Sequence, residues 1–316
     1  MTRRDYRAVE WDADLEADLH ELVRLAIRED LQSYHDWTTG LLVDPDAQAR
    51  AVVAARSDGV VAGLRGVALI AAEYDPRIVV QPLTADGDRV LRGAQLAELS
   101  GPARSLLIAE RPLLNLLGRL SGIATLTRRY VDAVAGTGAR IYDTRKTMPG
   151  WRRVDKFAVR MGGGCNHRLG LFDGILIKDN HLAQGRSNAT AEQFTPAEAV
   201  RRAKQFIAEQ RAAATGTRDL ELWDSMLVEI EVDRLDQLDA VLPERPDIVL
   251  LDNMVPDLLR EAVRRRDAAA PGVELEASGG VNLGTVRAIA ETGVERISVG
   301  GLTHSASWWD VGLDWL

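Results

Sequence analysis

The sequence has little of several features that define other protein classes. Its 316 residues include one cysteine, Cys165, so an intrachain disulfide and a cysteine-based zinc site are excluded, and a reducing, cytoplasmic setting is the simplest expectation. No stretch approaches the roughly 18 uninterrupted apolar residues of a membrane helix, and the first residues lack the apolar core of a signal peptide. Aromatic residues make up 5% of the chain and the formal net charge is −8, which argues against general nucleic-acid binding. We therefore expect a globular protein of about two domains, or one barrel with an appended piece.

The acidic total hides one basic segment. Residues 140–178 contain nine Lys or Arg against three Asp, a net charge of +6, so the rest of the chain carries −14. A concentrated positive field favours a small, highly anionic ligand over a long polyanion. The alternative interpretation is a solvated charged helix face, because most charge runs are of that kind.

The first third of the chain mixes helical and strand-like patterns. Residues 13–31 carry apolar side chains at helical spacing, and a second helical pattern runs from 105 to 135, with Pro112 suited to a first turn. A helix-and-sheet domain fits this region, and its β-like runs lie at 51–55, 60–64 and 78–80.

After residue 138 apolar strands alternate with helical stretches, which predicts βαβ units and a parallel sheet. Polar residues follow each strand, at the edge where an α/β barrel assembles its active site. An open doubly wound sheet would place its ligand at the same edge, so the barrel is a preference. We predict surface loops at 183–195 and 212–223 and helices at 195–211, 256–266 and 283–292. The predicted strands are 139–144, 174–178, 227–232, 247–252, 273–278 and 295–299.

Two glycine pairs close the last two predicted strands. Ser278-Gly279-Gly280 and Val299-Gly300-Gly301 each precede a predicted helix or turn. Glycine lets backbone N–H groups approach phosphate oxygens, and a helix N-terminus adds a favourable dipole. One such pair is more often an ordinary turn, but two at the end of a βα series indicate a phosphate site.

Cations gather at other strand ends. Arg145 and Lys146 follow the first predicted strand; arginine binds a carboxylate with two hydrogen bonds, whereas lysine offers a compact charge to phosphate. Three glycines precede His167 and Arg168, which suggests either a bend that delivers these side chains to a pocket or a helix end followed by a loop. Lys178 is a Schiff-base former, a phosphate ligand or simply a strand end.

Carboxylates close two further strands. Glu229 and Glu231 share a strand face by alternation, and Asp252 closes the next strand. Such carboxylates hold Mg²⁺ through one or two direct contacts while water and substrate phosphate complete its shell. The five histidines show no metal-ligand spacing, and no nucleophile elbow supports Ser-His-Asp chemistry.

Several sequence blocks together resemble the quinolinate phosphoribosyltransferases, the most specific being DTRKTMPG (143–150) and GGGCNHR (162–168). The resemblance implies an α/β fold with two parts. The first is an N-terminal α/β sandwich domain at 1–118, joined by the C-terminal 302–316. The second is an incompletely closed, seven-stranded parallel α/β barrel at 119–301, as in type II phosphoribosyltransferases. The other blocks are 109–127, 156–171, 176–181, 228–232, 250–253, 277–280 and 299–305.

The resemblance also implies an activity in de novo NAD synthesis. Quinolinate and phosphoribosyl pyrophosphate would give nicotinate mononucleotide, pyrophosphate and CO₂, with Mg²⁺ and no organic cofactor. The enzyme would be a cytoplasmic homodimer or hexamer with Arg111 donated across the interface, without nucleic-acid or membrane partners. Pro112 stands where the family usually has threonine, which changes how Arg111 leaves the start of its helix.

The family's functional residues carry over one by one. The quinolinate carboxylates would contact Arg111, Thr144, Arg145, His167 and Arg168. Quinolinate or the phosphates would contact Lys146 and Lys178. The ribose hydroxyls and the Mg²⁺–pyrophosphate would contact Glu231 and Asp252. With Lys146 and Lys178, these carboxylates form the predicted catalytic set. The 5-phosphate would lie against Ser278, Gly279, Gly280, Val299, Gly300, Gly301 and His304.

Two other functions stay open at this point. One is a paralogue associated with molybdenum utilisation, which would take a different substrate. The other is a Schiff-base aldolase or sugar-phosphate isomerase that uses Lys178 on the same barrel; the Arg145 and Arg168 pair, suited to a dicarboxylate, counts against it.

Overall fold

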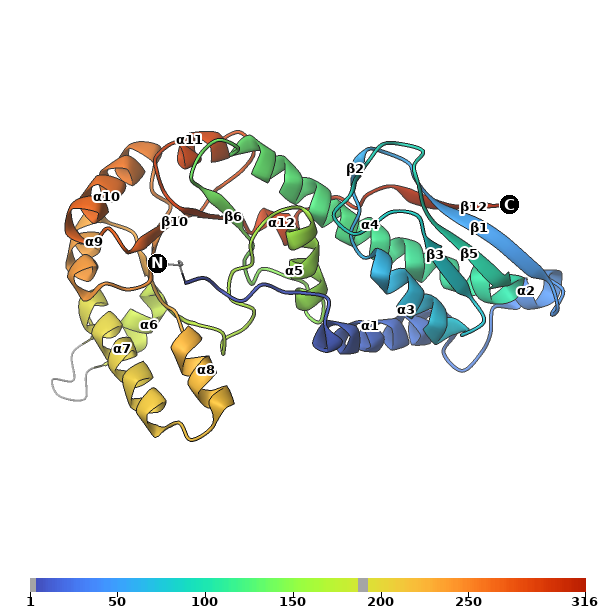
Figure 1. Cartoon of the computed structure of the whole chain (residues 1–316), viewed down its shortest axis with the longest axis horizontal. Helices are drawn as coiled ribbons and strands as arrows, with labels where there is room; N and C mark the ends of the chain where they lie inside the picture. The colour runs from blue at the N-terminus through green and yellow to red at the C-terminus, as the bar shows by residue number, and fades with distance from the viewer. Residues whose placement is uncertain (1–3, 187–192) are drawn as a thin grey trace. The chain divides into compact units, whose positions relative to one another are not determined.

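The computed structural model describes residues 4–186 and 193–316 (Figure 1). The chain forms two compact units. The first comprises Met1–Arg7, Asp132–Arg145 and Asn166–Val299, and the second comprises Ala8–Val131, Lys146–Cys165 and Gly300–Leu316. The domain boundary between residues 118 and 119 stays a prediction, because compact units need not coincide with units of folding. Among the described residues, no helix combines the length and the apolar character needed to cross a membrane.

The second unit is built on an antiparallel sheet of strand order β12-β1-β5-β3. The last strand of the chain, β12, pairs antiparallel with β1, so residues 311–315 complete a sheet that begins at residue 48. Its elements are α1 (Ala13–Leu31), α2 (Trp37–Leu42), β1 (Gln48–Ala55), β2 (Gly59–Val60), α3 (Leu64–Tyr74), β3 (Val79–Pro82), β4 (Arg89–Val90), β5 (Gln95–Pro102), α4 (Ala103–Ala133), α5 (Arg152–Met161), α12 (Gly301–His304) and β12 (Val311–Trp315).

Local sequence explains the first of these elements. The side chain of Asp12 accepts a hydrogen bond from the Leu15 backbone N–H (3.0 Å) and so caps α1. Leu15, Leu19 and Val23 follow at four-residue intervals and are buried, as an amphipathic helix requires.

Two predictions for this unit are wrong. Pro112 lies in the interior of α4 rather than in a first turn, because the helix already begins at Ala103. Arg111 is therefore an exposed residue within the helix and does not leave from a helix start. The predicted strand 60–64 is split: β2 ends at Val60, and Gly63 with φ +94° precedes α3. A left-handed residue ends the extended backbone there.

The first unit contains a parallel sheet of strand order β6-β11-β10-β9-β8-β7. In Figure 1 helices α9, α10 and α11 lie along the outside of this curved sheet. Its elements are β6 (Arg140–Tyr142), β7 (Ile175–Ile177), α6 (Asp179–Gln184), α7 (Pro196–Ala213), α8 (Thr217–Ser225), β8 (Val228–Val232), α9 (Leu235–Val241), the 3₁₀ helix η1 (Leu242–Glu244), β9 (Ile248–Asp252), α10 (Pro256–Ala269), β10 (Glu274–Ser278), α11 (Val286–Ala290) and β11 (Arg296–Ser298).

The α/β fold class is confirmed. No ladder joins β6 to β7 within the described residues, so the parallel sheet is an incompletely closed barrel. It has six strands in this part of the chain, not the seven that the resemblance implies. All six strands predicted from alternating apolar runs are present, because short buried strands followed by helices are the pattern of parallel sheets.

The predicted loops fare differently. The prediction of a surface loop at 212–223 is wrong, because most of this segment forms α8. Trp223 of α8 packs edge-on against Phe206 of α7, with ring centroids 5.8 Å apart. Part of the segment 183–195 lies outside the described residues. Its described ends belong to the last turn of α6 and to Thr195, whose side chain caps α7.

Candidate active site

The carboxyl ends of the parallel strands collect the predicted polar residues of the first unit. Ser278 on β10 lies opposite Asp252 on β9, and Glu231 on β8 lies opposite Leu250 of the same β9. Lys178 directly follows β7, and Thr144 and Arg145 follow β6 by two and three residues. Since parallel strands end at one edge of a sheet, the structure brings these side chains to that edge.

Asp143 joins the two most specific sequence blocks. It directly follows β6 and is fully buried. Its carboxylate accepts hydrogen bonds from the Asn166 side chain (2.7 Å) and from the His167 backbone N–H (2.9 Å). The turn that precedes Arg168 is therefore attached to the end of β6. This contact explains why widely separated blocks act as one structural feature.

The three glycines before this turn belong to the second unit, where they end α5. Gly162 is the C-terminal cap, and a Cβ atom there would lie 2.5 Å from the Ala124 carbonyl oxygen. Gly163 has φ +86°. Of the two interpretations offered by the sequence, a helix end followed by a loop describes this segment, and the loop leads into His167 and Arg168.

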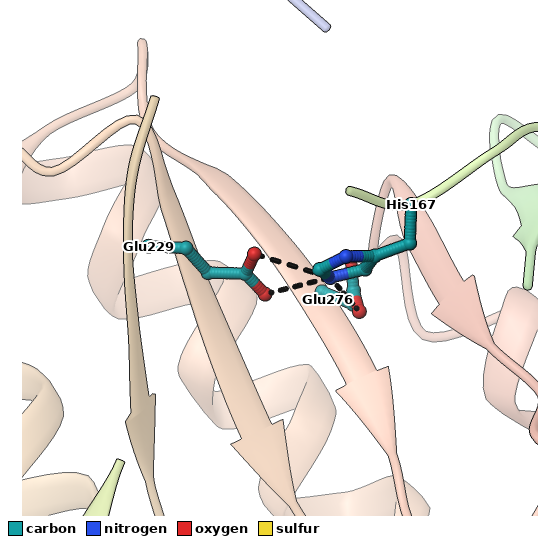
Figure 2. A group of neighbouring side chains, drawn as sticks. All are labelled: His167, Glu229 and Glu276. Atoms are coloured by element: carbon teal, nitrogen blue, oxygen red, sulfur yellow. Dashed lines mark hydrogen bonds and ion pairs between the residues drawn. The ribbon is translucent and has the colours of Figure 1, made fainter. Parts of the chain in front are cut away.

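His167 is buried against two carboxylates (Figure 2). Its Nε2 lies 3.1 Å from Oε2 of Glu229 and 3.5 Å from Oε1 of Glu276, while its Nδ1 accepts the Arg168 backbone N–H at 2.8 Å. Burial alone would lower the pKa of His167, but Glu229 and Glu276 raise it to about 9. Both ring nitrogens are thus directed at protein groups, and Nε2 carries a proton whether the ring is neutral or charged.

The same three residues offer ligand atoms within 4.8 Å of one another, a spacing that suits a metal ion. However, the carboxylates already have donors: Tyr6 donates to Glu229 (2.6 Å) and Arg296 donates to Glu276 (2.9 Å). Burial would raise the pKa of Glu276, but His167 and Arg296 hold it below its ordinary value. We interpret this group as a charge-compensated network, because its negative charge is balanced without a cation from solution.

The two arginines at the edge lack such balance. Within the described residues neither Arg145 nor Arg168 forms an ion pair with a carboxylate, and the buried Nε of Arg145 has no hydrogen-bond partner. Arg168 is 7% exposed, and its Nη1 donates to the Gly174 carbonyl oxygen (3.3 Å). Burial lowers the pKa of Arg168, and the nearby charge of Arg145 lowers it further. Within the described residues, two neighbouring guanidinium groups that form no ion pair with a carboxylate have the charge and geometry to bind an anion.

Lys178 and Glu231 form an ion pair across β7 and β8. The Lys178 side chain is 41% exposed. A Schiff base requires an uncharged amine, which proteins obtain by desolvation or by a neighbouring cation. Lys178 is instead partly exposed and paired with a carboxylate, so its geometry disfavours the aldolase alternative and fits contact with an anionic or hydroxylated ligand.

The turn after β10 has a left-handed backbone at both of its glycines, a conformation that glycine adopts without strain. Gly279 has φ +93°, and a Cβ atom there would lie 2.1 Å from Oδ1 of Asn253. Gly280 has φ +61° and open space around it. Asn253 in turn donates to Asp252 (2.7 Å), so the turn and the carboxylate are linked. The predicted helix dipole is not adjacent, because α11 begins at Val286.

The remaining predicted residues, Val299 apart, belong to the second unit. There, a Cβ atom on Gly300 would lie 2.9 Å from Cδ of Lys146 and 3.2 Å from Nε2 of His304, so these three residues form one group. Thr303 donates to the Lys146 carbonyl oxygen (2.8 Å) and fixes the backbone of this group, and Gly301 has open space around it. Val299, in the first unit, is buried at the end of β11.

Sequence reasoning missed Glu276, Tyr6 and Arg296. A signal existed for Glu276, because Glu274, Glu276 and Ser278 alternate along β10 and so share one face. Charged residues at every second position of a short apolar strand indicate a polar barrel interior. No comparable signal marks Tyr6, whose role depends on contacts more than 200 positions away along the chain.

A parallel α/β sheet defines a class of protein when its carboxyl edge carries glycine turns and, among the described residues, arginines without a carboxylate partner. That class is the α/β-barrel enzymes that bind small anionic substrates. Comparison with known sequences identifies the family. Residues 36–121 match the N-terminal domain of quinolinate phosphoribosyl transferase, and residues 123–314 match its C-terminal domain. The chain therefore belongs to the quinolinate phosphoribosyl transferase family.

Relatives and solved structures agree with this assignment. The chain is 42% identical over 307 residues to nicotinate-nucleotide pyrophosphorylase [carboxylating] of Mycobacterium leprae, covering 96% of this chain and 99% of the relative. It is 36% identical to the chloroplastic enzyme of the same name from Oryza sativa, covering 94% and 77%. The solved nicotinate-nucleotide pyrophosphorylase from Francisella tularensis superimposes with a TM-score of 0.85 at 33% identity, covering 99% of this chain and all of that one.

Proposed function

We propose that this protein transfers the phosphoribosyl group of phosphoribosyl pyrophosphate to quinolinate, with loss of CO₂, to form nicotinate mononucleotide and pyrophosphate. The observation that carries this proposal is the pair Arg145 and Arg168, which lack carboxylate partners within the described residues. Quinolinate presents two adjacent carboxylates, and two neighbouring guanidinium groups match that charge and planarity. The names of the relatives, which include quinolinate phosphoribosyltransferase [decarboxylating], support the same reaction.

The chemistry requires positioning and charge stabilisation more than a protein nucleophile. Cleavage of the C1–O bond leaves an oxocarbenium-like ribose and a departing pyrophosphate. Glu231 and Asp252 would hold the ribose hydroxyls, and Lys178, ion-paired with Glu231, would contact a carboxylate or a phosphate. After the ring nitrogen attacks C1, CO₂ leaves and its bonding electron pair stays on the ring carbon, where the adjacent cationic nitrogen stabilises it. That carbon then takes a proton from solvent, which completes nicotinate mononucleotide.

Phosphate binding is assigned to the glycine turns. Ser278, Gly279 and Gly280 would present backbone N–H groups to the 5-phosphate, since glycine at these positions leaves the backbone uncovered. Val299, Gly300, Gly301 and His304 would contribute from their own segment, with Lys146 beside Gly300. Thr144 and Arg111 would complete the contacts to quinolinate.

Mg²⁺ is the metal that we propose. Glu231 and Asp252 provide oxygen ligands on adjacent strands, which is the donor chemistry that Mg²⁺ prefers, and a partial protein shell suits an ion that also binds substrate phosphates. When bound, the ion neutralises charge that develops on the leaving pyrophosphate. We further propose that the enzyme is cytoplasmic and acts as a homodimer or larger assembly in which the exposed Arg111 reaches the partner's site.

Incubation with quinolinate, phosphoribosyl pyrophosphate and Mg²⁺ tests the activity. Mass detection should find nicotinate mononucleotide, with one CO₂ released per product. Nicotinate in place of quinolinate is the matched control and should give little product, because it has a single carboxylate for two arginines. Absence of product from quinolinate would contradict the proposal and favour the molybdenum-associated paralogue. Omission of Mg²⁺ in the presence of a chelator should abolish turnover.

A further inference from the structure

The first described residues of the chain pack into the parallel-sheet unit. They precede both family domains, the first of which begins at residue 36. Asp5 is the anchor of this segment. Its carboxylate accepts hydrogen bonds from Arg140 (2.7 Å), Tyr142 (2.7 Å) and Arg296 (2.8 Å). Arg4 adds an ion pair to Asp247 (3.0 Å). We call Arg4–Arg7 the N-terminal strap.

Tyr6 carries the strap into the interior. It is buried, its hydroxyl donates to Glu229 (2.6 Å), and its ring stacks on the imidazole of His167 with centroids 4.6 Å apart and an interplanar angle of 25°. The ring also lies beside Gly174, where an added Cβ atom would lie 2.7 Å from Cε1 of Tyr6. One tyrosine thus contacts His167, the carboxylate that holds it, and Gly174.

These contacts converge on Arg168. Its backbone N–H donates to Nδ1 of His167 (2.8 Å), and its guanidinium donates to the carbonyl oxygen of Gly174 (3.3 Å). Tyr6 therefore touches both residues that fix Arg168, one holding its backbone and the other its side chain. Arg168 is in turn one of the two cations at the sheet edge without a carboxylate partner in the described part of the chain.

We propose that the N-terminal strap positions Arg168 for the substrate dicarboxylate, acting from Tyr6 through His167 and Gly174. This inference rests on the proposed function, because it assumes that Arg168 binds quinolinate. It makes Tyr6 and His167 positioning residues: both ring nitrogens of His167 are engaged within the protein, so its contribution to binding runs through Arg168. Substitution of a residue that orients a ligand-binding side chain commonly changes the affinity for the ligand, even though that residue does not contact the ligand.

The decisive variant is Tyr6→Phe, which removes the hydrogen bond to Glu229 and leaves the ring stacked on His167. Loss of a buried hydrogen bond to a carboxylate should raise the KM for quinolinate about tenfold. The KM for phosphoribosyl pyrophosphate and kcat should stay within about twofold, because neither depends on Arg168. The dissociation constant of quinolinate alone, measured by calorimetry, should rise with its KM.

Two further variants make the result specific. Asp5→Asn loosens the anchor without touching His167, and it should change the two KM values in the same pattern by a smaller factor. Tyr74→Phe is the matched control, because the Tyr74 hydroxyl is buried without a hydrogen-bond partner among the described residues. It should leave both KM values and kcat unchanged.

A double-mutant cycle then tests the route. In an Arg168→Lys background, Tyr6→Phe should add less than about a twofold increase in the KM for quinolinate, because residues that act through one another are not additive. A full additional tenfold increase would overturn the proposal. A Tyr6→Phe enzyme with a normal KM for quinolinate would also overturn it. The same holds for a variant in which kcat falls while both KM values stay normal, because a segment that only stabilises the fold would behave in this way. A wild-type enzyme that binds quinolinate but does not turn it over would contradict the proposed function, and the calorimetry of Tyr6→Phe would still decide the role of the strap.

Discussion

The interior of the parallel sheet and its carboxyl edge both carry buried or partly buried arginines, but these differ in whether they are paired with carboxylates. Inside, Arg296 is fully buried and hydrogen-bonds three carboxylates, those of Asp5, Glu274 and Glu276. At the edge, Arg145 and Arg168 have no carboxylate partner in the described part of the chain. Burying an unpaired charge costs several kcal/mol, so the paired interior belongs to the fold and the unpaired edge is kept for an anionic ligand.

This difference also refines the meaning of the basic segment 140–178. Several of its cations have partners that the sequence alone does not indicate: Arg140 pairs with Asp5 within the first unit, and Arg153 pairs with Asp18 within the second. The net charge of +6 therefore overstates the field that a ligand meets. What matters is which cations lack a carboxylate partner, and within residues 4–186 and 193–316 Arg145 and Arg168 are two that do.

Arg296→Met should produce the largest effect on stability. Removal of Arg296 takes a buried cation away from Asp5, Glu274 and Glu276 at once, so the free energy of unfolding should fall by about 3–5 kcal/mol. Urea unfolding followed by circular dichroism measures it. A loss below about 1 kcal/mol would mean that the ion pairs of Arg296 do not stabilise the fold, and the contrast between interior and edge would fail.

Arg145→Ala and Arg168→Ala should affect activity as strongly as Arg296→Met affects stability. Each should lower kcat/KM for quinolinate about 10²–10³-fold, since each removes charge-assisted hydrogen bonds to a carboxylate. Thermal unfolding should remain within a few degrees of the wild-type value. Near wild-type turnover in either variant would remove that residue from the proposed site.

His167 predicts a dependence of stability on pH. Its pKa is raised from 6.5 to about 9 in the folded protein, so the stability it contributes is complete below pH 6.5 and is lost as the pH rises through 9. The loss should approach about 3 kcal/mol of unfolding free energy at most. The two buried carboxylates at Nε2 favour the charged ring, and charging the ring costs the hydrogen bond that Nδ1 of the neutral ring accepts from the Arg168 backbone N–H. The matched variant His167→Gln should lack this part of the pH dependence; identical profiles would show that the ring stays neutral.

The two glycines after β10 provide a comparison within the edge. Gly279→Ala should raise the KM for phosphoribosyl pyrophosphate more than Gly280→Ala, because only at Gly279 would the new Cβ atom collide, with Asn253 at 2.1 Å. Both alanines also adopt a left-handed backbone at a cost of about 1–2 kcal/mol. Steady-state kinetics with the two variants side by side separates the collision from the shared backbone cost. Equal KM values would mean that the turn does not need its close contact with Asn253.

Arg211→Ala should have the smallest effect. Its ion pair with Asp224 joins two side chains that are each more than half exposed. Such pairs contribute about 0–1 kcal/mol, and their contribution falls with salt. Urea unfolding should place this variant close to the wild type, which makes it the control for both sets of arginine substitutions. A loss as large as that of Arg296→Met would remove burial as the explanation of the difference.

The parts of the fold that follow local rules were predictable. The six parallel strands and α1 follow from apolar runs and helical spacing, because burial imposes those periods directly. Pro112 and the helix α8 were misjudged for the opposite reason: tertiary contacts keep α4 helical through a proline and pack α8 against α7. A residue's local preference decides little when such contacts outweigh it.

The candidate site divides in the same way. The sequence places Arg145, Lys178, Glu231 and Asp252 at strand ends, and parallel strands necessarily share an edge. It does not reveal that Tyr6 contacts Glu229, or that Asp143 binds the turn before Arg168. Those contacts join segments that the alternation of strands and helices leaves unrelated.

By itself, then, the sequence determined the α/β class, the order of the strands along the chain, the family and the residues at the strand ends, because these depend on local pattern and on motifs. Only the tertiary structure decided which of the charged residues neutralise one another and which are left for a ligand. The physical reason is that the state of a charge depends on its burial and its nearest partners, and both are set by segments far apart in the chain.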